Sequence, residues 1–149
     1  MNLLSVLDEN TVSLSLSGST KEAIIDELID ILVASGRISD RAEARLAVFE
    51  REHSMSTGMK NGIALPHGKT DSVPEMVACM GISKNGVAFD SMDGEPSRLF
   101  IMTLSKKSKT GPHLQFLAEV SKLFKSEQKR QALLNTATKA ELLKIMAAD

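Results

Sequence analysis

The chain has few aromatic residues and a single cysteine. Its 149 residues include no Trp, no Tyr and five Phe, so it lacks an aromatic platform on which nucleic-acid bases could stack. Cys79 cannot form a disulfide within the chain, and its place in an apolar run at residues 76–82 indicates a buried thiol in a reducing cytoplasm. We therefore expect a cytoplasmic protein that binds no nucleic acid.

The chain also has little net charge and no long hydrophobic run. A formal net charge of -1 gives no general attraction to nucleic acid or to an anionic membrane. No apolar stretch reaches the roughly 18 residues that a membrane-spanning helix needs, and the first residues do not resemble a signal peptide, so no direct membrane insertion is expected. With 42% hydrophobic residues and no repeat or linker, residues 1–149 are expected to form a single domain.

The first part of the chain predicts one strand followed by two helices. Apolar side chains alternate with serines over residues 12–16, as in a half-buried strand. Ser19 and Glu22 have the spacing of a capping box, and the helix that they introduce is expected to end at Gly36. A second helix is predicted at residues 40–52.

The remainder of the chain predicts buried strands and further helices. The expected strands lie at residues 62–65, 76–82 and 99–104. One helix is expected to begin at Pro112, and two shorter helices are expected at residues 126–134 and 139–147. A turn at residues 84–86 is expected to form a hairpin into residues 87–89. Leu46 in the second helix and Leu114 in the third are expected to pack inward. This mixture of elements predicts an α/β fold with a mixed β-sheet flanked by helices on both faces.

Three common kinds of site are poorly supported by the sequence. Gly68-Lys69-Thr70 resembles the end of a phosphate-binding P-loop, but Ile63 stands where that motif needs a glycine. The three histidines are far apart, without the close-spaced ligand pairs of a metal site, and His53 is expected to be an exposed helix-end residue. No Gly-x-Ser-x-Gly elbow of a serine hydrolase occurs. We therefore expect no metal, nucleotide or other cofactor.

His67 is the strongest candidate for chemistry. It follows a short apolar run and stands between Pro66, which has a fixed φ and no amide proton, and Gly68, which has no side chain. These neighbours are expected to end the strand and leave the imidazole clear at its end. A neutral imidazole is a good nucleophile at neutral pH. One ring nitrogen can attack phosphorus while the other donates its proton to a backbone carbonyl, so this setting favours phosphoryl transfer over the commoner structural role of a histidine.

Several other polar residues are candidates for assisting that chemistry. The amides and hydroxyls of Ser56, Thr57 and Gly58 could donate to phosphoryl oxygens. Arg51 could clamp the same oxygens, although a surface role at a helix end is commoner on its spacing alone. His113 lies in the first turn of the third expected helix, where free amides and the helix dipole favour anions. A solvated capping role for His113 is about as common.

Taken together, these motifs resemble a known family, the IIA components of the bacterial phosphoenolpyruvate-dependent sugar phosphotransferase system, of the fructose/mannitol class. The resemblance covers essentially the whole chain, in the family's order and at about its spacing. The matching elements are Arg51-Glu52, Ser56-Thr57-Gly58, residues 62–68 ending in Pro66-His67-Gly68, Asp93-Gly94, His113-Leu114 and Leu117-Ala118. Within the class, residues 66–70 and 87–94 are most similar to the fructose type.

The resemblance implies a cytoplasmic phosphotransferase subunit with a mixed sheet flanked by helices. His67 would be the phosphocarrier, which takes phosphate from the phosphohistidine of HPr or an HPr-like domain and passes it to a cysteine of a IIB component during sugar uptake. Arg51 and His113 would lie beside it. The alternative is the nitrogen-regulatory IIA branch, whose members keep the histidine but act by binding regulatory partners according to phosphorylation state.

Overall fold

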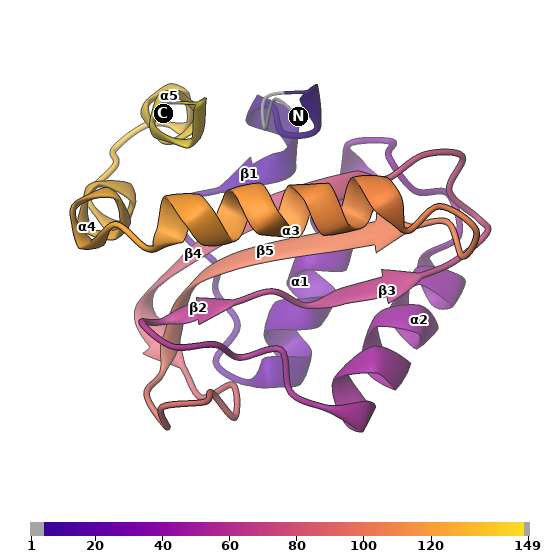
Figure 1. Cartoon of the computed structure of the whole chain (residues 1–149), viewed down its shortest axis with the longest axis horizontal. Helices are drawn as coiled ribbons and strands as arrows, with labels where there is room; N and C mark the ends of the chain where they lie inside the picture. Colours follow the sequence, from indigo (N-terminus) through magenta and orange to yellow (C-terminus); the bar gives the residue numbers. More distant parts are fainter. Residues whose placement is uncertain (1–4, 148–149) are drawn as a thin grey trace.

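The computed structural model describes residues 5–147 and shows a mixed β-sheet with helices on both faces (Figure 1). Across these residues the sheet has five strands in the order β1-β4-β5-β2, and β3 also pairs with β5. The strands are β1 (Val12–Ser13), β2 (Ile63–Ala64), β3 (His67–Lys69), β4 (Val77–Val87) and β5 (Ser97–Ser105). β5 runs antiparallel to β4 and parallel to β2 and β3. The predicted α/β fold with a mixed sheet is therefore confirmed.

The helices cover the sheet in two groups, each with its own core (Figure 1). The elements are the short 3-10 helix η2 (Glu9–Thr11), α1 (Lys21–Ala34), α2 (Arg41–Ser54), α3 (Gly111–Phe124), α4 (Glu127–Leu134) and α5 (Lys139–Ala147). Because successive strand residues point to opposite faces, Phe100 and Met102 of β5 pack with α1 and α2, whereas Leu99 and Ile101 pack with α3 to α5. This double burial explains why the central strands have continuous apolar sequences.

The start of α1 differs from the prediction, whereas its end agrees. The hydroxyl of Thr20 accepts the amide of Ala23 at 3.2 Å, so Thr20 caps the helix. The predicted capping box of Ser19 and Glu22 is therefore wrong by one residue, because the helix begins later than that spacing requires. Gly36 follows the helix with a φ of 77°, the left-handed conformation that glycine adopts without strain.

The predicted hairpin at residues 84–86 is wrong. β4 continues through this segment to Val87, with an irregularity in its pairing to β5 just before that residue. Gly86 has a φ of 79°, so it occupies a bulge inside a strand instead of a turn between strands. The chain reverses into β5 only after the turn at residues 91–94, where Gly94 has a φ of 73°. Bulges and turns both call for glycine at positive φ, which is why the sequence suggested the wrong one.

The packing of individual side chains agrees in part with the sequence pattern. Cys79 is fully buried in β4, as expected. Pro112 lies in the first turn of α3, as predicted. Leu46 and Leu114 were expected inside, but they lie at the surface with 60% and 62% of their area exposed. In α3 the buried residues include His113, Phe116 and Val120, which leaves Leu114 on the exposed side of the helix.

Candidate active site

His67 is the first residue of β3, which pairs with β5, the strand that also pairs with β2. β2 pairs with the first part of β5, and His67 pairs with Thr103 near its end. The predicted end of the strand before Pro66, which has no N–H to donate, is confirmed, because β2 ends at Ala64. The prediction that Gly68 also stops the strand is wrong, because His67 and Gly68 begin the new strand β3. Gly68 lies inside β3, where a Cβ atom would come within 2.8 Å of the backbone of Ala47. Glycine at this position therefore allows α2 to pack directly on β3.

The imidazole of His67 is held in one tautomer. Its Nδ1 lies 2.9 Å from the carbonyl oxygen of Leu65, and since a carbonyl only accepts, Nδ1 carries the proton and Nε2 the lone pair. Burial lowers the pKa of His67, and the positive charges of Arg51 and Lys69 add to this effect. The hydrogen bond to Leu65 and the charge of Glu52 act in the opposite direction. The predicted bond to a backbone carbonyl is present, and the ring is neutral at pH 7.

His113 brings a second imidazole to the same place. It lies in the first turn of α3 and is buried, and its ring centroid is 4.9 Å from that of His67 at an interplanar angle of 42°. Its Nδ1 lies 3.1 Å from the Oγ1 of Thr103 in β5. Burial lowers the pKa of His113 to about 4, and the neighbouring His67 and Lys69 contribute. At neutral pH the site therefore holds two uncharged imidazoles in contact.

Arg51 supplies a positive charge, whereas the third histidine lies elsewhere. Arg51 is in the last turn of α2, where its Nη1 donates to the carbonyl oxygen of Met55 at 2.7 Å. It is only partly buried, and its charge lowers the pKa of His67. His53 is exposed, and its ring contacts Phe49 at a centroid distance of 6.2 Å. The structure thus brings Arg51 to the site and leaves His53 as the exposed helix-end residue that was predicted.

The predicted phosphate-stabilising segment uses its donors inside the protein. The hydroxyl of Ser56 donates to the carbonyl oxygen of Phe89 at 2.7 Å and accepts the amide of Gly58 at 3.1 Å. Thr57 donates its amide and its hydroxyl to the carboxylate of Glu52, at 2.8 and 2.5 Å. In this structure these donors shape the loop between α2 and β2.

The anchor of that loop, Glu52, was not recognised from the sequence as an organising residue. Its side chain is only 2% exposed, and Lys21 of α1 neutralises it with Nζ 2.8 Å from Oε2. Burial lowers the pKa of Lys21, but the hydrogen bonds and charges of Glu52 and Asp90 outweigh it and leave that pKa raised. A signal existed, because Ala44, Val48 and Glu52 lie four residues apart on the buried stripe of α2. A carboxylate on such a stripe requires a cation from another element.

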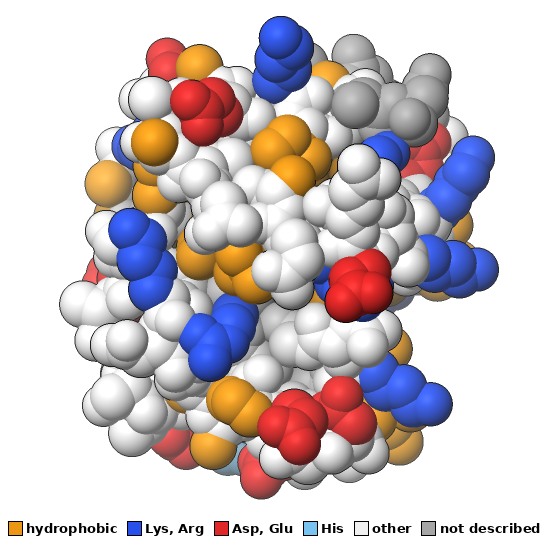
Figure 2. Space-filling view, turned by 90° about the vertical axis from the view of Figure 1, so that its left-hand side faces the viewer, with side chains coloured by type: hydrophobic (Ala, Val, Ile, Leu, Met, Phe, Trp, Pro, Cys, Tyr) orange, Lys and Arg blue, Asp and Glu red, His pale blue; other side chains and the backbone are white. Residues whose placement is uncertain are grey.

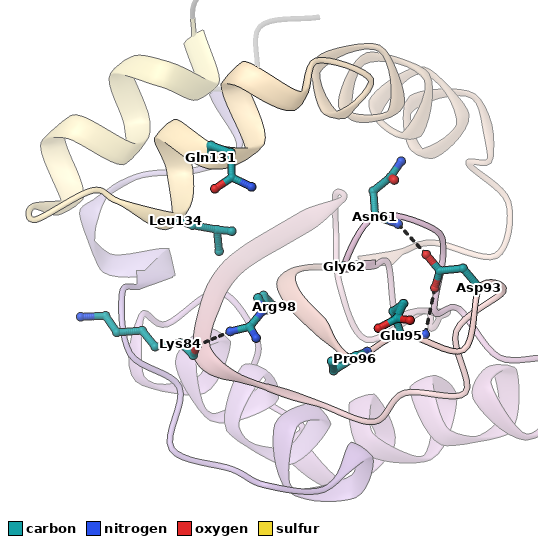
Figure 3. A pocket seen from close by; sticks show the side chains of 9 residues that line it. All are labelled: Asn61, Gly62, Lys84, Asp93, Glu95, Pro96, Arg98, Gln131 and Leu134. Atoms are coloured by element: carbon teal, nitrogen blue, oxygen red, sulfur yellow. Dashed lines mark hydrogen bonds between the residues drawn. The ribbon is translucent and has the colours of Figure 1, made fainter.

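A separate hollow of about 740 Å³ lies at the opposite end of the sheet (Figure 3). It is lined by Asn61, Gly62, Lys84, Asp93, Glu95, Pro96, Arg98, Gln131 and Leu134. Arg98 donates to the carbonyl oxygen of Lys84, and Asp93 accepts the amides of Asn61 and Glu95, each at 3.1 Å (Figure 3). Figure 2 shows this side of the molecule with acidic and basic side chains interspersed. None of the predicted site residues lines this hollow.

Residues 5–147 lack two further features, a metal-binding cluster and a membrane-spanning helix. Within that range no three His, Cys, Asp or Glu side chains are grouped so that they could bind a metal ion. Every helix in the same part of the chain is too short or too polar to cross a membrane.

Comparison with known proteins gives one family match and several similar proteins. Residues 5–149 match the family described as "Phosphoenolpyruvate-dependent sugar phosphotransferase system, EIIA 2". The chain is 36% identical over 136 residues to the fructose-specific EIIA component of Haloferax volcanii, which covers 91% of this chain and 88% of that protein. It is 34% identical over 146 residues to the fructose-specific EIIABC component of Bacillus subtilis, which covers 98% of this chain. The chain spans 23% of the length of that Bacillus protein.

Solved structures share the fold. The nitrogen regulatory protein IIA-Ntr from Neisseria meningitidis superimposes with a TM-score of 0.89 at 25% identity, over 95% of this chain and 97% of that one. IIA mannitol from Escherichia coli, in a complex with phosphorylated IIB mannitol, gives a TM-score of 0.82 at 24% identity, over 95% of this chain and 96% of that one.

Proposed function

Because the chain belongs to the EIIA 2 family of the phosphoenolpyruvate-dependent sugar phosphotransferase system, we propose that it carries a phosphoryl group on Nε2 of His67. One observation carries this proposal. The Nδ1 of His67 donates to the carbonyl oxygen of Leu65 at 2.9 Å, so that Nε2 holds the lone pair of a ring that is neutral at pH 7. The chain would receive the group from one protein and pass it to another.

In the proposed step, the lone pair on Nε2 of His67 attacks the phosphorus of a donor phosphohistidine. The new P–N bond forms as the P–N bond to the donor ring breaks, and the donor ring leaves with that electron pair. The ring of His67 thereby gains a positive charge. The carbonyl of Leu65 stabilises this charge because it already accepts from Nδ1–H. If the second nitrogen of the donor ring carries a proton, that ring leaves as neutral imidazole, and no proton has to enter or leave during the transfer.

We assign supporting roles to Arg51 and His113. The guanidinium of Arg51 has five N–H donors, and within residues 5–147 only one of them has a partner, the carbonyl of Met55, so the others remain for phosphoryl oxygens. His113 places a neutral ring beside that of His67, where it can donate to the same group. Residues 56–58 support the site indirectly, because their donors hold the loop that follows α2.

The proposed donor is phospho-HPr or an HPr-like domain, and the proposed acceptor is a cysteine of a fructose-type IIB component. Two relatives described above are fructose-specific by name. The Escherichia coli mannitol protein of the same fold is described in complex with phosphorylated IIB. The P–N bond of a phosphohistidine is a high-energy bond, so transfer to a thiolate runs downhill. Such partners would place the reaction in the cytoplasm.

A second candidate function is that of a nitrogen-regulatory IIA protein. The likeness to the Neisseria meningitidis structure supports it. Such a protein would accept phosphate on the same histidine but would act by binding a regulatory partner in only one phosphorylation state. Over at least 91% of the chain, the fructose-specific relatives are 34% and 36% identical, against 25% for the Neisseria meningitidis protein over 95%, which favours the transport role as the first proposal.

The phosphorylation site is tested by incubating the protein with phosphoenolpyruvate, enzyme I and HPr. We expect one acid-labile, base-stable phosphate on the wild-type chain and none on His67→Gln. His53→Gln is the matched control, since it removes an exposed histidine elsewhere in α2. Normal phosphorylation of His67→Gln would overturn the proposal.

The acceptor is tested by mixing the phosphorylated protein with purified IIB components and following the phosphate on His67. Rapid loss to a fructose-type IIB, but not to its Cys→Ser variant, would support the transport role. If no IIB accepts the phosphate and a regulatory protein binds only one phosphorylation state, the regulatory function replaces it.

A further inference from the structure

Thr103 is a buried hydroxyl between the two histidines of the site. It lies near the end of β5, which runs beneath α3 (Figure 1), and it is 2% exposed. Across the ladder it pairs with His67, and its amide donates to the carbonyl oxygen of Pro66 at 3.2 Å. Its Oγ1 lies 3.1 Å from the Nδ1 of His113 on the other side. Thr103 therefore pairs with the backbone segment that holds His67 and also contacts the ring of His113 directly.

The direction of the hydrogen bond between Thr103 and His113 follows from counting hydrogens. Among residues 5–147, the Nδ1 of His113 is the only partner of the Thr103 hydroxyl. If Nδ1 were the donor, the hydroxyl would keep its own hydrogen buried without an acceptor, which is unfavourable. If the hydroxyl donates to Nδ1 instead, both atoms are satisfied. The neutral state of His113 is what makes a lone pair on Nδ1 available.

We propose that Thr103 is a positioning residue that fixes His113 in the tautomer with its proton on Nε2. The two rings then hold opposite tautomers. His67 keeps its proton on Nδ1, bonded to Leu65, and presents a lone pair on Nε2. His113 keeps its lone pair on Nδ1 and has an N–H on Nε2, for which no partner exists among residues 5–147. One ring thus supplies the nucleophile and the other a donor for the phosphoryl oxygens, a consequence that rests on the proposed function.

Imidazole nitrogen shifts, read by long-range 1H–15N NMR on the unphosphorylated protein, test this assignment. The chain has only three histidines, so His53→Gln and His113→Gln suffice to assign the spectrum. We expect the signals of His113 to show a protonated Nε2 and an Nδ1 that accepts a hydrogen bond. A protonated Nδ1 on His113 in the wild-type chain would overturn the proposal, whether or not His67 accepts phosphate.

Two substitutions of Thr103 separate its hydroxyl from its packing. Thr103→Val keeps the branched shape that suits a strand but removes the hydroxyl, and Thr103→Ser keeps the hydroxyl. We expect Thr103→Val to shift the Nδ1 signal of His113 to that of a nitrogen without a donor and to slow phosphoryl transfer to His67 about tenfold. Thr103→Ser should restore both. An unchanged Nδ1 signal in Thr103→Val would overturn the role of Thr103, while failure of His67 to accept any phosphate would overturn only the proposed function.

Discussion

β5 connects two ends of the molecule that contain similar kinds of residue but use them differently. Around the hollow near its start, Arg98 donates to the carbonyl oxygen of Lys84 beside the bulge in β4, and Asp93 accepts two backbone amides, so these charged side chains stabilise the local backbone. Near its other end, His67 and His113 each have one nitrogen tied to a neighbour, while the second is left without one among residues 5–147. The reactive end is thus marked by polar atoms that are fixed in place but still available, and the volume of the hollow is a poor guide to it.

The two arginines give the strongest test of that contrast. Each donates to a backbone carbonyl, Arg51 to that of Met55 just after α2 and Arg98 to that of Lys84 in β4, so Arg51→Ala and Arg98→Ala each remove one such bond. Because Arg51 is proposed to stabilise charge that develops at His67, we expect its loss to slow transfer from phospho-HPr by up to about 10²-fold. Arg98→Ala should leave the rate unchanged in rapid-quench assays. Equal rates for the two variants would contradict the contrast.

Gly68, next to His67, and Gly94, in the turn before β5, differ in how tightly their surroundings are packed. A Cβ at Gly68 would lie 2.8 Å from backbone atoms of Ala47 and Val48, whereas Gly94 has no atom within 4 Å of that position. We expect Gly68→Ala to lower the free energy of unfolding by about 3 kcal/mol, because α2 has to move away from β3. Gly94→Ala meets only the strain of its positive φ and should cost about 1 kcal/mol. Urea denaturation measures both, and equal costs would show that α2 tolerates displacement.

The buried imidazole of His113 predicts a pH dependence that belongs to the reactive end. Its pKa is about 4 in the folded chain against an ordinary value of 6.5, so between these values the unfolded chain binds more protons. The free energy of unfolding therefore falls as the pH is lowered through this window, by about 2 kcal/mol between about pH 7.5 and pH 5.

Chemical denaturation at both pH values, on the wild type and on His113→Gln, isolates this contribution, since the other groups titrate in both proteins. We expect a smaller loss of stability in the variant. A loss of equal size would mean that His113 does not titrate with the lowered pKa.

The sequence predicted elements well where one physical effect dominates. β4 and β5 were found because strands buried on both faces are apolar throughout, and α4 and α5 because their apolar spacing is helical. The segment at residues 84–86 was misjudged because a glycine at positive φ serves bulges and turns alike. Its role depends on whether β5 is long enough to pair beyond it, which local sequence does not contain.

In the candidate site, the sequence predicted His67 with Arg51 and His113 beside it, but not the contacts that hold them. His67 was identified from its proline and glycine neighbours and from the resemblance of the surrounding motifs. Thr103 reads as an ordinary strand residue until α3 places His113 against it. Lys21 pairs with Glu52 from 31 positions away. These contacts join separate elements, so only the packed fold shows them.

The reactivity of Cys79 reports on the separation of α1 from the central sheet. It is fully buried in β4, with Sγ 3.4 Å from the carbonyl oxygen of Leu28 in α1, and burial raises the pKa of its thiol. Such a thiol stays protonated and inert towards alkylating reagents while α1 covers the sheet. Because no second cysteine exists in the chain, each labelled molecule records one separation of α1 from β4. The labelling rate in excess reagent therefore measures how often α1 separates from β4, with or without phosphate on His67.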